Sequence, residues 1–144
     1  MNPILYLALL ALSCGYAFYR GGRYERLVAA VCILGTVATV AVNSPFNRLY
    51  SHVEAGALAV DLAVLTAFVV VALQSDRFWP LWVAGLQLTT SVAHFLKALD
   101  PHLIPQAYGL AVRFWSYPIL IILAVGSWRA HRRMMAERRR RTAV

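Results

Sequence analysis

Long, uninterrupted apolar runs dominate the pattern of hydrophobic and polar positions along the chain. Five such runs are separated by short polar connections, and within each run the apolar residues are continuous rather than alternating. A helix satisfies its own backbone hydrogen bonds, and about 20 apolar residues in a helix cross the core of a bilayer. We therefore predict five membrane-spanning helices, at residues 4–19, 27–43, 54–73, 79–98 and 107–127.

The composition narrows the class of protein. Of the 144 residues, 60% are hydrophobic and 14% are charged, whereas soluble domains are about 45–50% apolar. The mean hydropathy is +0.62. These values exclude a soluble enzyme, a disordered chain and a disulfide-stapled secreted module. They predict an all-α fold, a polytopic transmembrane helical bundle at residues 1–128 that is followed by a basic tail at residues 129–144.

The distribution of basic residues predicts the orientation of the chain in the membrane. The net charge is +8, and most of the arginines lie at residues 20–26, at Arg77 and in the tail. With the N-terminus outside, eleven basic residues lie on the cytoplasmic side, and only Arg48 and Lys97 lie in outer connections. The positive-inside rule then favours an outer N-terminus and a cytoplasmic C-terminus. If the first segment lies flat on the membrane, four spans remain and the N-terminus moves inside.

The tail is expected to continue the last helix into water and to anchor it at the membrane surface. Each basic side chain near an anionic lipid surface contributes about 1 kcal/mol of binding. The predicted partners are therefore the lipid bilayer and its anionic headgroups, and docking on another protein or on nucleic acid is the less favoured alternative. The predicted anchoring residues are Arg129, Arg132, Arg133, Arg138, Arg139, Arg140 and Arg141.

Two charged residues lie inside apolar segments. Asp61 is seven residues into the third segment and Arg113 is at a matching position in the fifth, so both are expected at the same depth in the outer half of the bilayer. Charges inside a membrane usually pair. We predict a structural ion pair between Asp61 and Arg113. A proton or ligand site is the alternative, and a third reading has Arg113 extending to the surface.

The fourth segment has a polar stripe at helical spacing. The stripe contains Gln87, Thr90, Ser91 and His94, with Lys97 one turn further on. These side chains predict either a hydrogen-bonded bundle core or an outward-facing pocket for a quinone headgroup, a lipid headgroup or a small anion. The candidate ligand or ion-pair residues of such a pocket are Glu54, Asp61, His94, Lys97 and Arg113.

Other patterns point away from catalysis and metal binding. His94 is the histidine well inside a predicted helix, while a bound haem needs two axial histidines at facing depths. The chain has no haem-attachment, zinc-protease, phosphate-loop or nucleophile-elbow motif. Cys14 and Cys32 are expected to be free packing residues near the reducing cytoplasm. We expect no metal, no cofactor and no enzymatic activity.

Small residues recur every four positions on the third segment. These are Ala55, Ala59, Ala63 and Ala67. Small side chains let helix backbones approach closely where lipid supplies no hydrophobic force between helices. We predict that this stripe packs inside the bundle, and a seam between two copies of the chain is the alternative.

The stretch Ser75-Asp-Arg-Phe-Trp-Pro-Leu-Trp82, together with Trp115-Ser-Tyr-Pro118, resembles small uncharacterised polytopic inner-membrane proteins of proteobacteria. The resemblance covers most of the chain and rests on aromatic residues near helix boundaries. It implies a multi-pass location in the bacterial inner (cytoplasmic) membrane. It implies no activity.

Three functions are compatible with these patterns. The first is a non-catalytic integral inner-membrane protein that serves as an accessory or assembly subunit of a larger membrane complex. The second is a small transporter or proton-coupled carrier that uses the outer polar cluster. The third is a redox anchor that binds quinone or haem. We favour the first because ionisable groups are few and no catalytic set is evident.

Overall fold

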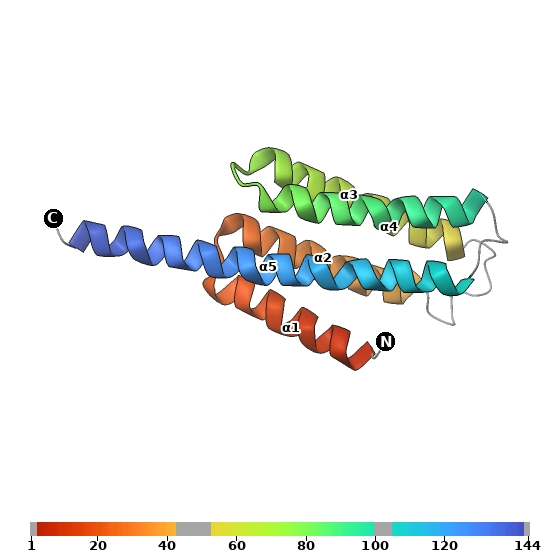
Figure 1. Cartoon of the computed structure of the whole chain (residues 1–144), viewed down its shortest axis with the longest axis horizontal. Helices are drawn as coiled ribbons and strands as arrows, with labels where there is room; N and C mark the ends of the chain where they lie inside the picture. Colours follow the sequence, from red (N-terminus) through yellow and green to blue (C-terminus); the bar gives the residue numbers. More distant parts are fainter. Residues whose placement is uncertain (1–2, 43–52, 100–104, 143–144) are drawn as a thin grey trace.

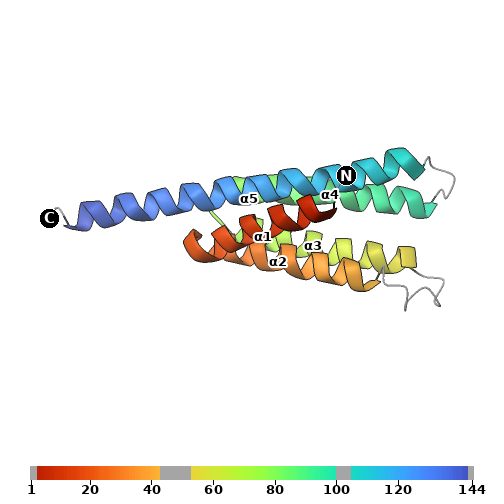
Figure 2. The same cartoon turned by 90° about the horizontal axis from the view of Figure 1, so that it is seen from below.

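The computed structural model describes residues 3–42, 53–99 and 105–142, with side chains described except at 3, 53–55, 97–99, 105–113 and 115. Within these ranges the chain is all-α and forms a helical bundle, as predicted (Figures 1 and 2). The helices are α1 (Pro3–Arg20), α2 (Arg23–Val42), α3 (Val53–Gln74), α4 (Trp79–Leu99) and α5 (Pro105–Thr142).

The helix bounds follow the predicted apolar segments with two differences. Helix α2 begins at Arg23, four residues earlier than expected, so the arginines at 23 and 26 lie in its first turn and not in a loop. Helix α5 continues without interruption to Thr142 and projects beyond the other helices (Figure 1). The predicted extension of the last helix into the tail is thus present in the structure.

The helices pack in chain order around a ring. Each helix contacts the next one along the chain, and α5 closes the ring against α1. In the described part of the chain, α3 packs mainly between α2 and α4. The buried core of this ring includes Cys14, Val28, Phe68, Val83 and Leu123, one from each helix.

The corner between α1 and α2 is very tight. The N–H of Gly21 donates a hydrogen bond to the carbonyl of Ala17 at 2.9 Å. A Cβ atom at Gly21 would lie 2.4 Å from that carbonyl oxygen and 2.7 Å from Cβ of Glu25. Only glycine fits there, and the reason is this close approach, since no described residue has a positive φ.

Two glycines lie at close contacts between α2 and α3. A Cβ atom at Gly35 would lie 2.8 Å from Cγ2 of Val64, and one at Gly56 would lie 2.9 Å from Cγ1 of Val42. Ala59 and Ala63 are exposed, so the expectation that they pack inside the bundle is wrong. The reason is rotational: the face of α3 that meets its neighbours carries other residues. Ala67 is partly buried, and Ala55 lies outside the described side chains.

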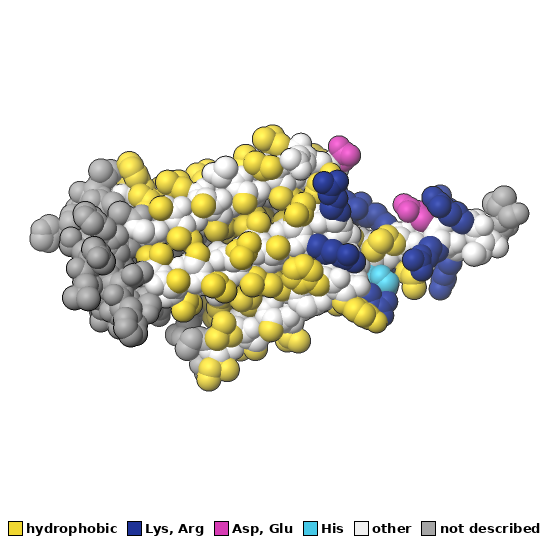
Figure 3. All heavy atoms as spheres, turned by 180° about the vertical axis from the view of Figure 1, so that it is seen from behind, with side chains coloured by type: hydrophobic (Ala, Val, Ile, Leu, Met, Phe, Trp, Pro, Cys, Tyr) yellow, Lys and Arg dark blue, Asp and Glu magenta, His cyan; other side chains and the backbone are white. Residues whose placement is uncertain are grey.

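The outer surface of the bundle is apolar. Large hydrophobic side chains are exposed along its length, and Lys and Arg side chains gather toward one end and on the projecting helix (Figure 3). Among the described residues, Arg23–Val42 and Gly56–Gln74 are long and apolar enough to cross a membrane, and Ile4–Arg20 is apolar but shorter. Only 22% and 17% of the two longer stretches are buried, unlike the core helices of a soluble protein. These two helices give weak support for a membrane association.

Candidate functional site

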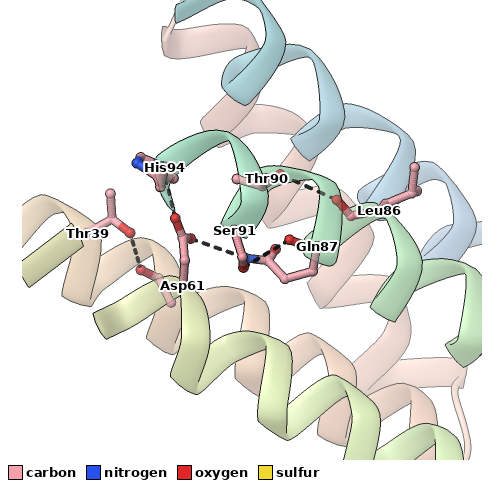
Figure 4. Close-up of polar contacts among 8 residues, drawn as sticks. Thr39, Asp61, Leu86, Gln87, Thr90, Ser91 and His94 are labelled. Atoms are coloured by element: carbon pink, nitrogen blue, oxygen red, sulfur yellow. Dashed lines mark hydrogen bonds and ion pairs between the residues drawn. The ribbon is translucent and has the colours of Figure 1, made fainter. Parts of the chain in front are cut away.

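Asp61 of α3 is bound by two side chains of α4. Gln87 donates a hydrogen bond from Nε2 to Oδ1 of Asp61 at 3.1 Å, and Nε2 of His94 lies 2.9 Å from Oδ2 (Figure 4). The side chains of His94 and Asp61 are 19% and 16% exposed, and Gln87 is buried. Both carboxylate oxygens therefore have a partner, which offsets much of the cost of removing the charge from water.

Helical spacing explains why Gln87 and His94 reach the same carboxylate. They are seven residues apart, or about two turns, and so lie on one face of α4. The hydroxyls between them behave differently, because Thr90 and Ser91 donate to the carbonyls of Leu86 and Gln87 within their own helix. The predicted stripe thus divides into two residues that cross to α3 and two that are satisfied inside α4.

The arrangement can hold a proton between two helices. A neutral His94 donates its Nε2 proton to Asp61, and a protonated His94 forms an ion pair with it. The chemistry available here is therefore proton binding or structural cross-linking. Thr39 of α2 is drawn beside Asp61 in Figure 4 and donates to the carbonyl of Gly35 in its own helix.

The other candidate residues lie outside the described side chains. These are Glu54, Lys97 and Arg113. The ion pair between Asp61 and Arg113 therefore stays a prediction. The described partners of Asp61 come from α4, the neighbour of α3 in the ring, whereas Arg113 belongs to α5.

A second buried charge was not anticipated from the sequence. Glu25 in the first turn of α2 is 1% exposed, and Nη1 of Arg77 donates to its Oε1 at 2.5 Å. Its Oε2 is buried without a hydrogen-bond partner among the described residues. The pair joins the α1–α2 corner to the α3–α4 corner. The available signal was that Glu25 is the one acid among the three arginines at residues 20–26.

Further contacts fasten the arginine-rich end of the bundle. Nη1 of Arg20 lies 2.8 Å from Nε2 of His131, so that nitrogen accepts the hydrogen bond and α1 is tied to α5. Tyr24 donates from its hydroxyl to the carbonyl of Gln74 at 2.6 Å. These bonds and the Glu25–Arg77 pair place both tight corners and the base of the tail at one end of the molecule. The seven tail arginines, from Arg129 onward, are exposed.

The structure describes two of the four histidines and both cysteines. His94 directs Nε2 at Asp61, and His131 lies at the arginine-rich end of α5, while His52 and His102 lie outside the described residues. Among the described residues, no group of three or more His, Cys, Asp or Glu side chains is placed to hold a metal ion. Both cysteines are free; Cys14 is buried and donates weakly to the carbonyl of Ala29.

Comparisons of the chain with protein-family models, with curated proteins and with solved structures gave no match.

Proposed function

We propose that the protein is a multi-pass integral protein of the bacterial inner membrane and serves as a non-catalytic accessory or assembly subunit of a larger membrane complex. In this proposal the chain crosses the membrane five times, with its N-terminus outside and its C-terminus in the cytoplasm. The observation that carries it is the set of large apolar side chains exposed on all the described helices. On the face shown in Figure 3, the apolar surface meets a basic end where α5 projects.

Every helix contributes to this apolar surface. Each helix has a large apolar side chain that is 59–80% exposed. In chain order these are Leu12 (72%), Leu34 (67%), Leu73 (80%), Trp82 (68%) and Phe114 (59%). Exposing such a side chain to water costs about 1.5–3 kcal/mol relative to burial, so a surface composed of them favours lipid as the solvent. This argument extends to helices that length and hydropathy alone do not identify as spans.

Aromatic residues support the position of the cytoplasmic boundary. Tyr19, Phe78 and Trp128 are exposed, and each directly adjoins an arginine, at positions 20, 77 and 129. Tyrosine and tryptophan favour the level of the lipid headgroups because an apolar ring carries a polar O–H or N–H. Phe78 adds an apolar ring beside Arg77. The resemblance noted in the sequence supports the same membrane.

Membrane fractionation and a reporter test this part of the proposal. After an alkaline carbonate wash, the protein should remain in the membrane pellet, and a reporter fused after Val144 should be active only in the cytoplasm. Release by carbonate would contradict membrane integration. An active periplasmic reporter at that position would contradict the orientation.

Exposed small residues support the role as a subunit. Ala59 and Ala63 on α3, and Ala8 and Gly15 on α1, face outward. A Cβ atom at Gly15 would meet nothing within 4 Å. Small residues on a lipid-facing surface let a further transmembrane helix approach closely, which is how membrane subunits associate.

The subunit role is tested by co-purification in a mild detergent. We expect a discrete partner that is retained by the wild-type protein and by Leu73→Ala, but lost with Ala63→Leu, because leucine there would separate the two backbones. Equal retention by all three proteins would contradict this interface. Migration of the wild type as a lone chain, with no partner to lose, would contradict the subunit role itself.

A proton-coupled carrier is a second candidate, and the Asp61–His94 contact is the observation that favours it. An ionisable pair within membrane helices is a typical element of proton pathways. In sealed vesicles that contain the purified protein, this function predicts proton movement that Asp61→Asn abolishes while the protein stays folded. A subunit without transport activity predicts no difference between the protein and empty vesicles.

A further inference from the structure

A groove opens at the arginine-rich end of the bundle, between the α1–α2 corner and the projecting part of α5. Its volume is about 580 Å³. Arg23 and Arg26 of α2 supply its charge, and the Gly21-Gly22 backbone forms part of its wall. Its apolar lining comes from three helices, with Phe18 of α1, Leu27 and Ala30 of α2, and Met134 of α5.

The two arginines of this groove are not neutralised within the described part of the chain. Arg23 and Arg26 are exposed, lie three residues apart on one face of α2, and have no acidic partner among the described residues. Glu25, the acid of the same turn, is 1% exposed, and its Oε1 accepts from Arg77. Two guanidinium groups therefore stand beside an apolar surface with their donors available to an anion.

Charged side chains are followed by apolar ones along α2, in the same order as the headgroup and acyl chain of a lipid. The arginines occupy the first turn, at the boundary of the apolar surface, while Leu27 and Ala30 lie about one turn further into the bundle. Phe18, three residues before Gly21 on α1, adds an aromatic ring to the lining. A free inorganic anion would use only the charged end of this groove, whereas a lipid uses both ends.

We propose that this groove binds an anionic glycerophospholipid of the cytoplasmic leaflet. The phosphate lies on Arg23 and Arg26, and an acyl chain follows Leu27 and Ala30 toward the bilayer core. The site is distinct from the arginine run at residues 138–141 farther along α5, which is not part of the lining of the groove. The inference rests on the membrane placement proposed above.

Retention of added lipid by the purified protein tests the site. The probes are phosphatidylglycerol and, as a zwitterionic control, phosphatidylcholine, each added to the delipidated protein in mild detergent and measured by native mass spectrometry. The variant Arg23→Gln/Arg26→Gln removes the phosphate partners. The variant Arg138→Gln/Arg139→Gln removes the same charge from the tail. Ala30→Phe fills the apolar part of the groove and leaves both arginines in place.

We expect Arg23→Gln/Arg26→Gln to weaken phosphatidylglycerol binding about tenfold or more, since each arginine near an anionic headgroup contributes about 1 kcal/mol. Ala30→Phe should also weaken it, and the tail variant should bind like the wild type. Phosphatidylcholine binding should be weak and equal in all four proteins.

Three results would overturn the inference. They are equal losses in the groove and tail variants, unchanged binding by Ala30→Phe, and displacement of phosphatidylglycerol by millimolar inorganic phosphate, which would indicate a plain anion site. Circular dichroism of each variant confirms that it is folded. Carbonate fractionation of the wild type is measured separately, so a protein that stays in the membrane but lacks selective lipid binding refutes this site without refuting the membrane placement.

Discussion

Nε2 of His94 on α4 lies 2.9 Å from Oδ2 of Asp61 on α3, and this contact joins two helices that are neighbours in the ring. Gln87 occupies the other oxygen of the carboxylate. These contacts fix the orientation of α3 and α4 about their own axes. Turning either helix would leave the carboxylate of Asp61 in apolar surroundings without its partners.

A double-mutant cycle should detect this coupling. We expect Asp61→Asn and His94→Leu each to lower the free energy of unfolding by about 1–3 kcal/mol, because each leaves a polar group without its partner. The double variant should lose less than the sum of the two, by about 0.5 kcal/mol or more. Thermal unfolding in detergent provides the measurement, and strict additivity would contradict the pairing.

The same cycle with Arg113→Gln tests the ion pair predicted from the sequence. If Arg113 also contacts Asp61, Asp61→Asn and Arg113→Gln should be coupled, and the double variant should recover part of the loss. If Arg113 extends to the headgroups, the two effects should add. This comparison separates a carboxylate shared between two helices from one held by α4 alone.

The burial difference between Glu25 and Arg77 predicts an asymmetric response to mutation. The side chain of Glu25 is 1% exposed and that of Arg77 is 30% exposed. Arg77→Gln leaves a buried carboxylate unpaired and should cost about 3–5 kcal/mol of unfolding free energy. Glu25→Gln should cost less, because Arg77 can turn toward water. Chemical denaturation of both variants in detergent measures the difference, and a larger loss for Glu25→Gln would refute the argument.

The sequence was sufficient for the elements but not for their pairings. Continuous apolar runs predict helices, and the residues that the structure describes form five helices. Depth along a segment places Asp61 and Arg113 at one level, yet it carries no information on which neighbour a residue faces. The ring order decides that, and it brings His94 and Gln87 to Asp61. Both had been identified as members of the polar stripe, so the residues were predictable and the contact was not.

The other differences between the sequence predictions and the structure have a similar cause. Residues 20–26 are mostly polar, which suggests a loop, but polar residues also suit the first turn of a helix that starts at a membrane surface. The positive-inside rule counts only basic residues, so it gives no sign that Glu25, the one acid among them, is buried and paired with Arg77. The regular spacing of the alanines on α3 predicts an interior stripe. Small residues occur on both packed and exposed faces of membrane helices, so spacing alone does not show which face is buried.

Two glycines of the bundle should respond oppositely to the same change. At Gly21 an added Cβ would lie 2.4 Å from the carbonyl oxygen of Ala17, whereas at Gly85 it would meet nothing within 4 Å. Gly21→Ala should therefore force the corner apart and cost about 1–3 kcal/mol. Gly85→Ala, inside α4, should be neutral or stabilise by up to about 1 kcal/mol. Thermal unfolding of the pair provides the test, and equal effects would show that the corner tolerates expansion.

The direction of α1 can be tested by chemical labelling at its two ends. Arg20 is tied to His131 at the arginine-rich end, and α1 runs from there toward the opposite end of the bundle but ends short of α4 and α5 (Figure 1). A spanning α1 therefore places Ile4 on the outer side of the membrane. Ile4 and Tyr19 are both exposed, at 72% and 78%. In a Cys14→Ala/Cys32→Ala background, a membrane-impermeant maleimide added to intact spheroplasts should label Ile4→Cys, and it should label Tyr19→Cys only after the membrane is opened. If α1 instead lies flat on the cytoplasmic face, neither position will be labelled before opening and both will be labelled afterwards. That result would reduce the spans to four and move the N-terminus to the cytoplasm while the basic end stays where it is.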